Sequence, residues 1–252
     1  MKVDISAVLE GGYEKTVART GVQFAAVFFA LSALNALFAP EPETLPMEDS
    51  PVGDVAPAGG GGPTGPSLGL SPTVAGLLSL LVTILSALVA IAAIRTFVAG
   101  ETESIPEEYF TRSIVWVAVN FVIGGIAFAI VVGIGLVFLV VPGLFLLVSL
   151  FFWQVFIAVE DENFLEGFRH SWQLTKGRRF GLFVLGVVVI FVALVISIAF
   201  GIPGVFFPAI LALLVEQVGS ALVFVFVLAA TAEAYNQLTA ADHEGDTVDT
   251  SL

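Results

Sequence analysis

The chain has 252 residues, of which 58% are hydrophobic and only 12% are charged, and its mean hydropathy is +1.01. Soluble globular proteins carry about 25% charged residues, so this composition excludes that class and indicates an integral membrane protein. The formal net charge is −13, and the absence of cysteine excludes disulfides, thiolate metal sites and thiol catalysis.

Six apolar segments are long enough, or nearly long enough, to cross a membrane as helices. At a rise of about 1.5 Å per residue, about 20 apolar residues cross about 30 Å of hydrocarbon. The continuous Val, Leu, Ile and Phe runs lack the alternation of β-barrel strands, so the sequence predicts an all-α, polytopic helical bundle. We expect its spans at residues 21–39, 74–98, 113–140, 143–159, 180–202 and 208–235.

The first two spans are separated by residues 40–73, which hold eight of the twelve prolines and five acidic residues. Such a composition cannot bury enough apolar surface to fold by itself. We expect a flexible external loop, with a binding lid or a partner site as the alternative reading.

The third and fourth spans are separated only by the dipeptide Pro142-Gly143. A single helix over residues 113–159 would be about 70 Å long, which is twice what a bilayer needs. The sequence therefore predicts a hairpin that turns tightly at this dipeptide.

The distribution of basic residues predicts the orientation. Counted against the six spans, every Lys and Arg falls on one side, and this side is cytoplasmic because Lys and Arg are retained there during insertion. We expect a cell-membrane protein with both termini in the cytoplasm, including the acidic tail at 239–252. The residues that give this pattern are Lys2, Lys15, Arg19, Arg95, Arg112, Arg169, Lys176, Arg178 and Arg179.

The segment FRHSWQLTKGRR, at 168–179, carries four of the nine bases between the fourth and fifth spans. Asn163 followed by Glu166 is typical of a helix N-cap, and Gly177 is typical of a stop, so we expect a helix from about 164 to 176. Its apolar face would lie in the cytoplasmic headgroup layer as an interfacial amphipathic helix. That face comprises Phe164, Leu165, Phe168 and Trp172.

Basic side chains beside such a face can extend toward lipid phosphates. The alternative is an anchor that fixes topology and prefers no lipid. The candidate headgroup-binding residues are Arg169, Trp172, Lys176, Arg178 and Arg179.

Three polar residues interrupt the apolar spans and are candidates for an intramembrane polar site: Asn120, Gln154 and Glu216. Glu216 is the only carboxylate deep inside a predicted span, and a charge at that depth is costly. It is either protonated or hydrogen-bonded inside the bundle, to Gln217 or Asn35, or the sixth span begins near Gln217 and leaves Glu216 in external water. A buried Glu216 would favour ion-coupled transport.

The acidic excess is spread over the predicted soluble segments. Paired acids such as Asp161-Glu162 could hold a divalent cation, but no ligand loop of known spacing accompanies them, and the two histidines are isolated. A sequence pI near 4.3 is typical of a halophilic protein whose acidic surface keeps it soluble in strong salt. We expect no metal, no cofactor and no nucleic-acid partner.

Residues 141–186 combine a Pro-Gly turn, an apolar span, an acidic pair and the motif Ser-Trp-x-Leu-Thr-x-Gly at 171–177. In this they resemble the membrane domain that accompanies some glycerophosphoryl diester phosphodiesterases. The segment GGYEKTVARTG, at 11–21, is similar to haloarchaeal multi-pass proteins of unassigned function. The resemblance implies a membrane module without hydrolase activity, because the phosphodiesterase chemistry of that family belongs to a separate soluble domain.

No nucleotide-binding loop, hydrolase elbow or metalloprotease motif occurs in the chain. The sequence therefore predicts a non-catalytic module that organises the membrane, associates with lipid or binds a partner. A small transporter that uses Glu216 is the alternative, and an intramembrane lipid enzyme is the third hypothesis. The expected partners are the lipid bilayer and anionic lipid headgroups, with a membrane protein or a second copy of this chain as further candidates.

Overall fold

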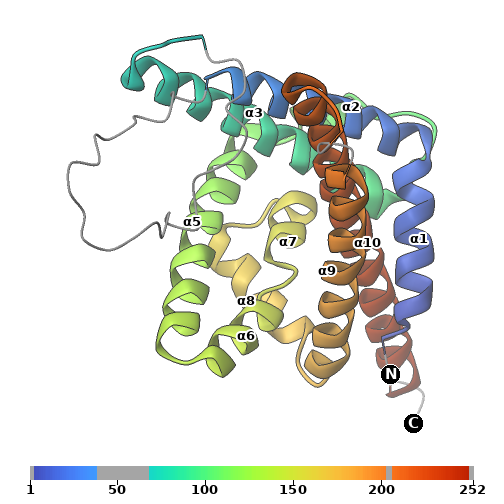
Figure 1. Ribbon diagram of the computed structural model, residues 1–252. Coiled ribbons are helices and arrows are strands. Elements are labelled where there is room, and N and C mark those ends of the chain that lie inside the picture. Colours follow the sequence, from blue (N-terminus) through green and yellow to red (C-terminus); the bar gives the residue numbers. More distant parts are fainter. Residues whose placement is uncertain (1–2, 39–67, 203–205, 250–252) are drawn as a thin grey trace.

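A computed structural model describes residues 3–38, 68–202 and 206–249, and within these ranges the regular structure is helical (Figure 1). Six stretches are long and apolar enough to span a membrane, which confirms the predicted class of a polytopic helical bundle. The helices are α1 (Ile5–Val17), α2 (Arg19–Phe38), α3 (Pro72–Ala99), α4 (Glu108–Thr111), α5 (Ile114–Phe138), α6 (Val140–Ser149), α7 (Trp153–Glu160), α8 (Phe164–Leu174), α9 (Arg179–Gly201) and α10 (Ala209–Asp249).

Four of the predicted spans agree with α2, α3, α5 and α9 to within two residues at each end. The sixth span is longer than predicted, because α10 continues without a break to Asp249 and takes in most of the predicted acidic tail. Residues 40–67 of the predicted external loop lie outside the described residues.

The helix α1 precedes the first span and was not predicted from the sequence. Asp4 caps its first turn by accepting the backbone N–H of Ala7 at 3.1 Å. Gly12 of α1 lies so close to α10 that an added Cβ would be 3.1 Å from Cα of Ala230. Lys15 of α1 forms an ion pair with Glu233 of α10. These contacts bring the start of α1 and the end of α10 to the same end of the molecule (Figure 1).

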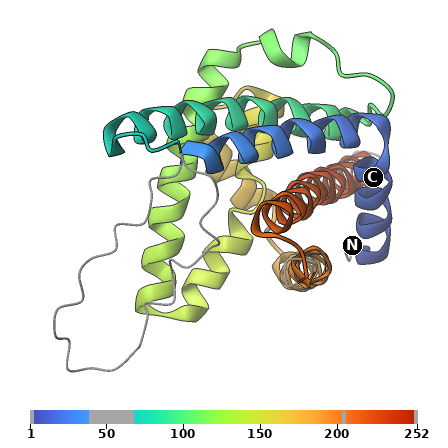
Figure 2. The same ribbon diagram turned by 45° about the horizontal axis from the view of Figure 1, so that its top comes forward.

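The helix α10 lies at the centre of the bundle and packs against α1, α2, α3 and α9. Its buried face is built largely from small side chains, including the fully buried Val225, Ala229 and Ala232. Small residues allow helices to approach closely, and such van der Waals contact stabilises helix association in lipid. The helices α2 and α3 lie side by side in both views and cross over α10 (Figures 1 and 2).

The helices α5 and α6 form the predicted hairpin, but the predicted position of its turn is wrong. The chain turns at Leu139, which has extended backbone angles, three residues before Pro142-Gly143. Pro142 lies in the first turn of α6, where a helix has no partner for its N–H groups and proline is therefore tolerated. Gly143 packs so tightly on α5 that an added Cβ would be 2.5 Å from the backbone nitrogen of Leu136.

The α5–α6 hairpin crosses α2 and α3 and is exposed at its tip (Figures 1 and 2). In both views α5 runs across the direction of α2 and α3 (Figures 1 and 2). The residues around its tip are largely exposed, with Val137 at 83% and Phe138 at 78%. The described part of the chain therefore leaves this apolar tip uncovered.

The fourth span is broken. Its apolar run, Val140–Glu160, is interrupted at residues 150–152, so that α6 and α7 are separate helices. A break inside an apolar segment leaves backbone groups that need partners, because lipid cannot provide hydrogen bonds.

Candidate lipid-binding sites

The helix α8 begins where the sequence predicts it. Asn163 is its N-cap, and the side-chain oxygen accepts the backbone N–H groups of Leu165 and Glu166, both at 3.0 Å. The helix ends at Leu174, two residues before the predicted end, and Gly177 follows with the positive φ of 81° that glycine adopts readily.

The amphipathic pattern predicted that the whole apolar face of α8 points away from the protein. In the structure only part of this face does so. Phe164 and Phe168 pack against the protein core, and the Phe168 ring lies edge-on to Trp153 of α7 at 5.9 Å. Leu165 and Trp172 remain exposed. A helical wheel cannot separate these two pairs, because lipid and a neighbouring helix are equally apolar. The location of α8 in the headgroup layer stays a prediction.

Two hydroxyl groups of the motif Ser-Trp-x-Leu-Thr-x-Gly supply partners for the break in the fourth span. Ser171 Oγ donates to the carbonyl of Ser149 at 3.1 Å and accepts the backbone N–H of Phe152 at 3.0 Å. Thr175 Oγ1 donates to the same Ser149 carbonyl at 3.2 Å. Both hydroxyl residues are fully buried. The motif therefore joins α8 to the gap between α6 and α7.

Arg179, the first residue of α9, lies in a corner formed by two aromatic rings. Its guanidinium carbon is 4.5 Å from the centre of the Phe145 ring and 4.4 Å from that of the Trp172 ring. The two rings are themselves edge to face at 5.4 Å. Among the described residues, Arg179 Nε is buried without a hydrogen-bond partner. Cation–π contacts of this kind contribute about 0.5 to 2 kcal/mol each, depending on desolvation.

The other predicted headgroup residues are arranged around this corner. Arg169 and Lys176 are exposed. Arg178 is partly buried, and its Nη1 donates a long hydrogen bond of 3.5 Å to the carbonyl of Leu238 in α10. The structure thus brings Trp172 and Arg179 together, and it directs Arg178 toward the protein.

Two further basic residues, the buried Arg95 and the exposed Arg112, form a cluster around the partly buried Asp161. Arg95 donates through Nε to the carbonyl of Ala158 at 2.6 Å and through Nη2 to Asp161 Oδ1 at 2.7 Å. Arg112 pairs with Asp161 Oδ2 at 3.1 Å and donates to the carbonyl of Val159 at 2.7 Å. Because these carbonyls end α7, the two arginines cap that helix.

The same cluster joins α7 to the short helix α4. Arg95 Nη1 donates to the carbonyl of Tyr109 at 2.9 Å. Burial, followed by the charges of Glu101 and Glu108, raises the pKa of the Tyr109 phenol, so this side chain stays neutral beside the arginines. The adjacent acid, Glu162, pairs with His170 of α8. The acidic pair Asp161-Glu162 thus has protein partners on both of its members.

The three predicted intramembrane polar residues do not form a common site. Asn120 is buried, and its side chain donates to the carbonyl of Trp116 at 3.0 Å and accepts the N–H of Phe164 at 3.2 Å, so it holds the start of α8. Gln154 is half-buried in α7. Glu216 is exposed on α10, which is continuous from Ala209, and the alternative of a membrane span that begins near Gln217 stays a prediction.

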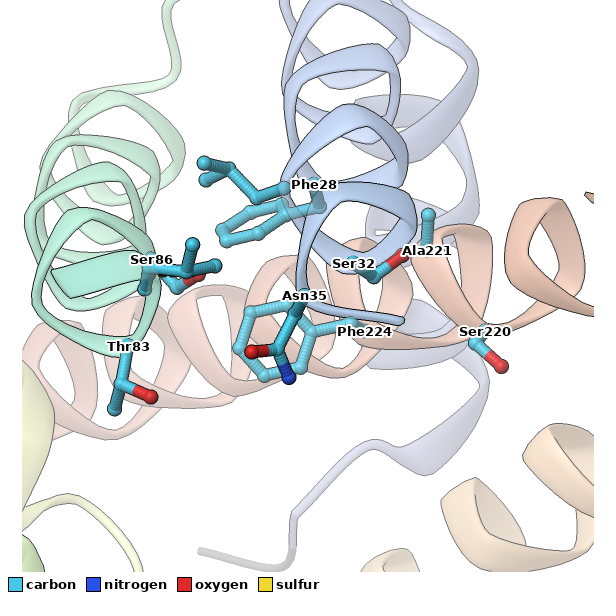
Figure 3. A pocket seen from close by; sticks show the side chains of 10 residues that line it. Phe28, Ser32, Asn35, Thr83, Ser86, Ser220, Ala221 and Phe224 are labelled. Atoms are coloured by element: carbon cyan, nitrogen blue, oxygen red, sulfur yellow. Dashed lines mark hydrogen bonds between the residues drawn. The ribbon is translucent and has the colours of Figure 1, made fainter. Parts of the chain in front are cut away.

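A cavity of about 350 Å³ opens between α2, α3 and α10 (Figure 3). Of the described residues that line it, none is charged, and half carry a hydroxyl or amide group. The apolar residues are Phe28, Leu31, Val82, Ala221 and Phe224, and the polar residues are Ser32, Asn35, Thr83, Ser86 and Ser220.

Residues 3–238 match the model of a family described as Domain of unknown function (DUF7847). The chain belongs to this family. The match extends from the residues before α1 into the last third of α10, so it includes α1 to α9 and most of α10. No curated protein and no solved structure matches the chain.

Sequence reasoning missed three features of this DUF7847 protein that concern its candidate sites. Phe145 lies 34 residues before Arg179 in an apolar run, and no local pattern distinguishes it from its neighbours. Ser171 and Thr175 carry a usable signal, because their spacing of four places both hydroxyls on one face of a helix. The cavity could have been suspected from Thr83 and Ser86, because their spacing places two hydroxyl groups on one face of an apolar helix.

Proposed function

We propose that this protein is a non-catalytic membrane protein that binds anionic lipid headgroups at the corner where α8 meets α9. The observation that carries the proposal is the position of Arg179 between Phe145 and Trp172. The two rings hold the guanidinium in place, so less conformational freedom is lost when it binds a phosphate. Arginine also offers paired N–H donors that match phosphate oxygens.

The surroundings of Arg179 suit a membrane surface. Trp172 and Phe145 are partly exposed, and Phe180 is 81% exposed. Aromatic rings are enriched at the level of the lipid headgroups, where an apolar body and a polar neighbour are both satisfied. Arg169 and Lys176 add exposed positive charge, and each base near an anionic surface contributes about 1 kcal/mol at moderate ionic strength.

The proposed orientation has this corner in the cytoplasm of the cell, together with both chain ends. It is supported by the ion pair between Lys15 and Glu233 and by the contact of Arg178 with Leu238, which place these bases near the C-terminal half of α10. The resemblance of residues 141–186 to the membrane domain of glycerophosphoryl diester phosphodiesterases fits a role at phospholipid headgroups, and it stays a prediction.

The test measures lipid retention by the purified full-length protein in mixed micelles of phosphatidylglycerol and phosphatidylcholine. Arg179→Gln is expected to reduce bound phosphatidylglycerol about three- to tenfold, because a charge-assisted contact to phosphate is lost. Arg19→Gln removes an equal charge from the exposed start of α2 and is the matched control, with retention within twofold of the unchanged protein.

Arg179→Lys separates charge from geometry. A lysine keeps the positive charge but lacks the planar fork, so partial retention is expected. If Arg179→Gln and Arg19→Gln retain phosphatidylglycerol equally, the bases serve only to fix topology and the proposal is wrong.

A further inference from the structure

The cavity between α2, α3 and α10 takes no part in the proposed headgroup site. We propose that it binds the polar end of a neutral lipid that carries a hydroxyl group, such as a long-chain alcohol. Its volume of about 350 Å³ lies near the lower end of the range of about 300–1,000 Å³ that is typical of small-molecule pockets. The three helices that form it are membrane-spanning candidates, so the remainder of such a chain would lie in the surrounding bilayer.

Three of the four hydroxyl groups that line the cavity already donate their proton within the protein and are left as acceptors. Thr83 donates to the carbonyl of Ser79 at 2.8 Å, and Ser86 donates to that of Val82 at 2.8 Å. A hydroxyl has one proton and two lone pairs, so these groups have used their proton and keep acceptor capacity. Ser32 is engaged in the same way with the carbonyl of Phe29 at 3.2 Å. A ligand that donates a hydrogen bond therefore suits these three hydroxyl groups.

The walls of the cavity suit a hydrocarbon chain. Phe28 of α2 and Phe224 of α10 meet edge to face at 4.7 Å, and Figure 3 shows these rings between Ser86 on α3 and the α10 backbone. Asn35 points into the same space from α2 and offers both a donor and an acceptor. This mixture of apolar walls and a few convergent polar groups is typical of a ligand site.

The absence of charge from the described lining selects against anionic lipids. A carboxylate or phosphate inside the cavity would have no basic partner there, and burying an unpaired charge is costly. A hydroxyl group can be satisfied by Thr83, Ser86 or Asn35. The cavity therefore distinguishes an alcohol from the corresponding acid, whereas the Arg179 corner favours anions.

The experiment uses hexadecanol with a photoreactive diazirine near its hydroxyl group, and hexadecanoic acid with the same diazirine. Each probe is added to the full-length protein in phosphatidylcholine nanodiscs, irradiated and located by peptide mass spectrometry. We expect the alcohol to label peptides that contain 28–35, 82–86 and 220–224, at least about tenfold more than the acid. Phosphatidylglycerol is not expected to compete, which keeps this test separate from that of the Arg179 site.

Two variants with matched controls test the site itself. Thr83→Val keeps the shape of the side chain but removes the acceptor, and it is expected to lower labelling by the alcohol about three- to tenfold. Thr73→Val makes the same change on an exposed residue of α3 outside the cavity and is expected to leave labelling unchanged. Ser86→Leu should abolish labelling by filling the space, whereas Ser79→Leu, which is outside the lining, should not.

Either of two results would overturn the proposal. One is equal labelling of these three segments by the alcohol and the acid. This would mean that the cavity does not distinguish a hydroxyl group from a carboxylate. The other is labelling of Thr83→Val at the level of Thr73→Val, which would mean that the lining hydroxyls do not hold the ligand.

Discussion

The basic residues around Asp161 and those at the α8–α9 corner differ in what satisfies them. Arg95 is 4% exposed, and its donors reach three backbone carbonyls and one carboxylate of the protein. Arg179 faces two aromatic rings, and its one hydrogen bond among those described is a long one, 3.5 Å, to the carbonyl of Trp172. The positive-inside rule treats both residues alike. We infer that a base can bind lipid only where the protein has not already engaged its donors.

The largest effect on stability is expected from Arg95→Gln. Removing the buried member of an ion pair costs up to about 3 to 5 kcal/mol of unfolding free energy, and Asp161 would keep only its second pair, with the exposed Arg112. The end of α7 would also lose a cap at Ala158. Thermal unfolding in detergent should show a clear loss of stability for Arg95→Gln.

Arg179→Gln is the control for Arg95→Gln, because it removes the same charge from the α8–α9 corner and not from the cluster around Asp161. Its cost in stability is expected to be only about 1 to 2 kcal/mol, since it loses two partly exposed cation–π contacts of about 0.5 to 1 kcal/mol each. If the two variants lose equal stability, the division between structural and lipid-binding bases is wrong.

The next effect concerns the broken fourth span. Ser171→Ala removes the acceptor of the buried Phe152 N–H and one donor to Ser149, and an unsatisfied buried group costs about 1 to 3 kcal/mol. Ser104→Ala, on an exposed residue, is the control and should change stability by less than about 0.5 kcal/mol. The measurement is again the unfolding free energy in detergent. A loss no larger than that of the control would show that the break does not depend on α8.

The sequence predicts the fold more fully than it predicts the sites. Span length and hydropathy depend on local composition, so α2, α3, α5 and α9 could be located within two residues. The helix α1 escaped prediction because its pattern is only weakly apolar and it is stabilised by contacts with α10, such as Gly12 against Ala230. The break at 150–152 escaped because its partners, Ser171 and Thr175, lie some twenty residues later.

The candidate sites were only partly predictable because they also depend on contacts between residues that are distant in the sequence. Residue type and spacing identified Trp172 and Arg179, which the structure brings together. They could not show that Phe164 and Phe168 pack against the protein, or that Asn120 holds the start of α8. Glu216 was singled out by its depth in a predicted span, but exposure depends on which face of α10 meets neighbouring helices, and that is set by the whole bundle.

The smallest effect is expected when one ring of the aromatic corner is removed. Phe145→Leu removes one of the two rings that face Arg179 but keeps an apolar side chain of similar size. Since a partly exposed cation–π contact contributes about 0.5 to 1 kcal/mol, retention of phosphatidylglycerol should fall about two- to fivefold. Phe138→Leu makes the same change at the exposed tip of the α5–α6 hairpin and is expected to have no effect on retention.

The dependence of phosphatidylglycerol retention on salt is a further test of the Arg179 corner. Raising NaCl from 0.1 to 1 M shortens the Debye length from about 10 to about 3 Å, so attraction between the exposed bases and anionic lipid is screened. Retention of phosphatidylglycerol should therefore fall with salt in the unchanged protein, while the buried Arg95–Asp161 pair should keep its contribution to stability. If Phe145→Leu and Phe138→Leu retain lipid equally at 0.1 M, the rings do not organise Arg179 for binding, and the corner is no more than a positively charged surface.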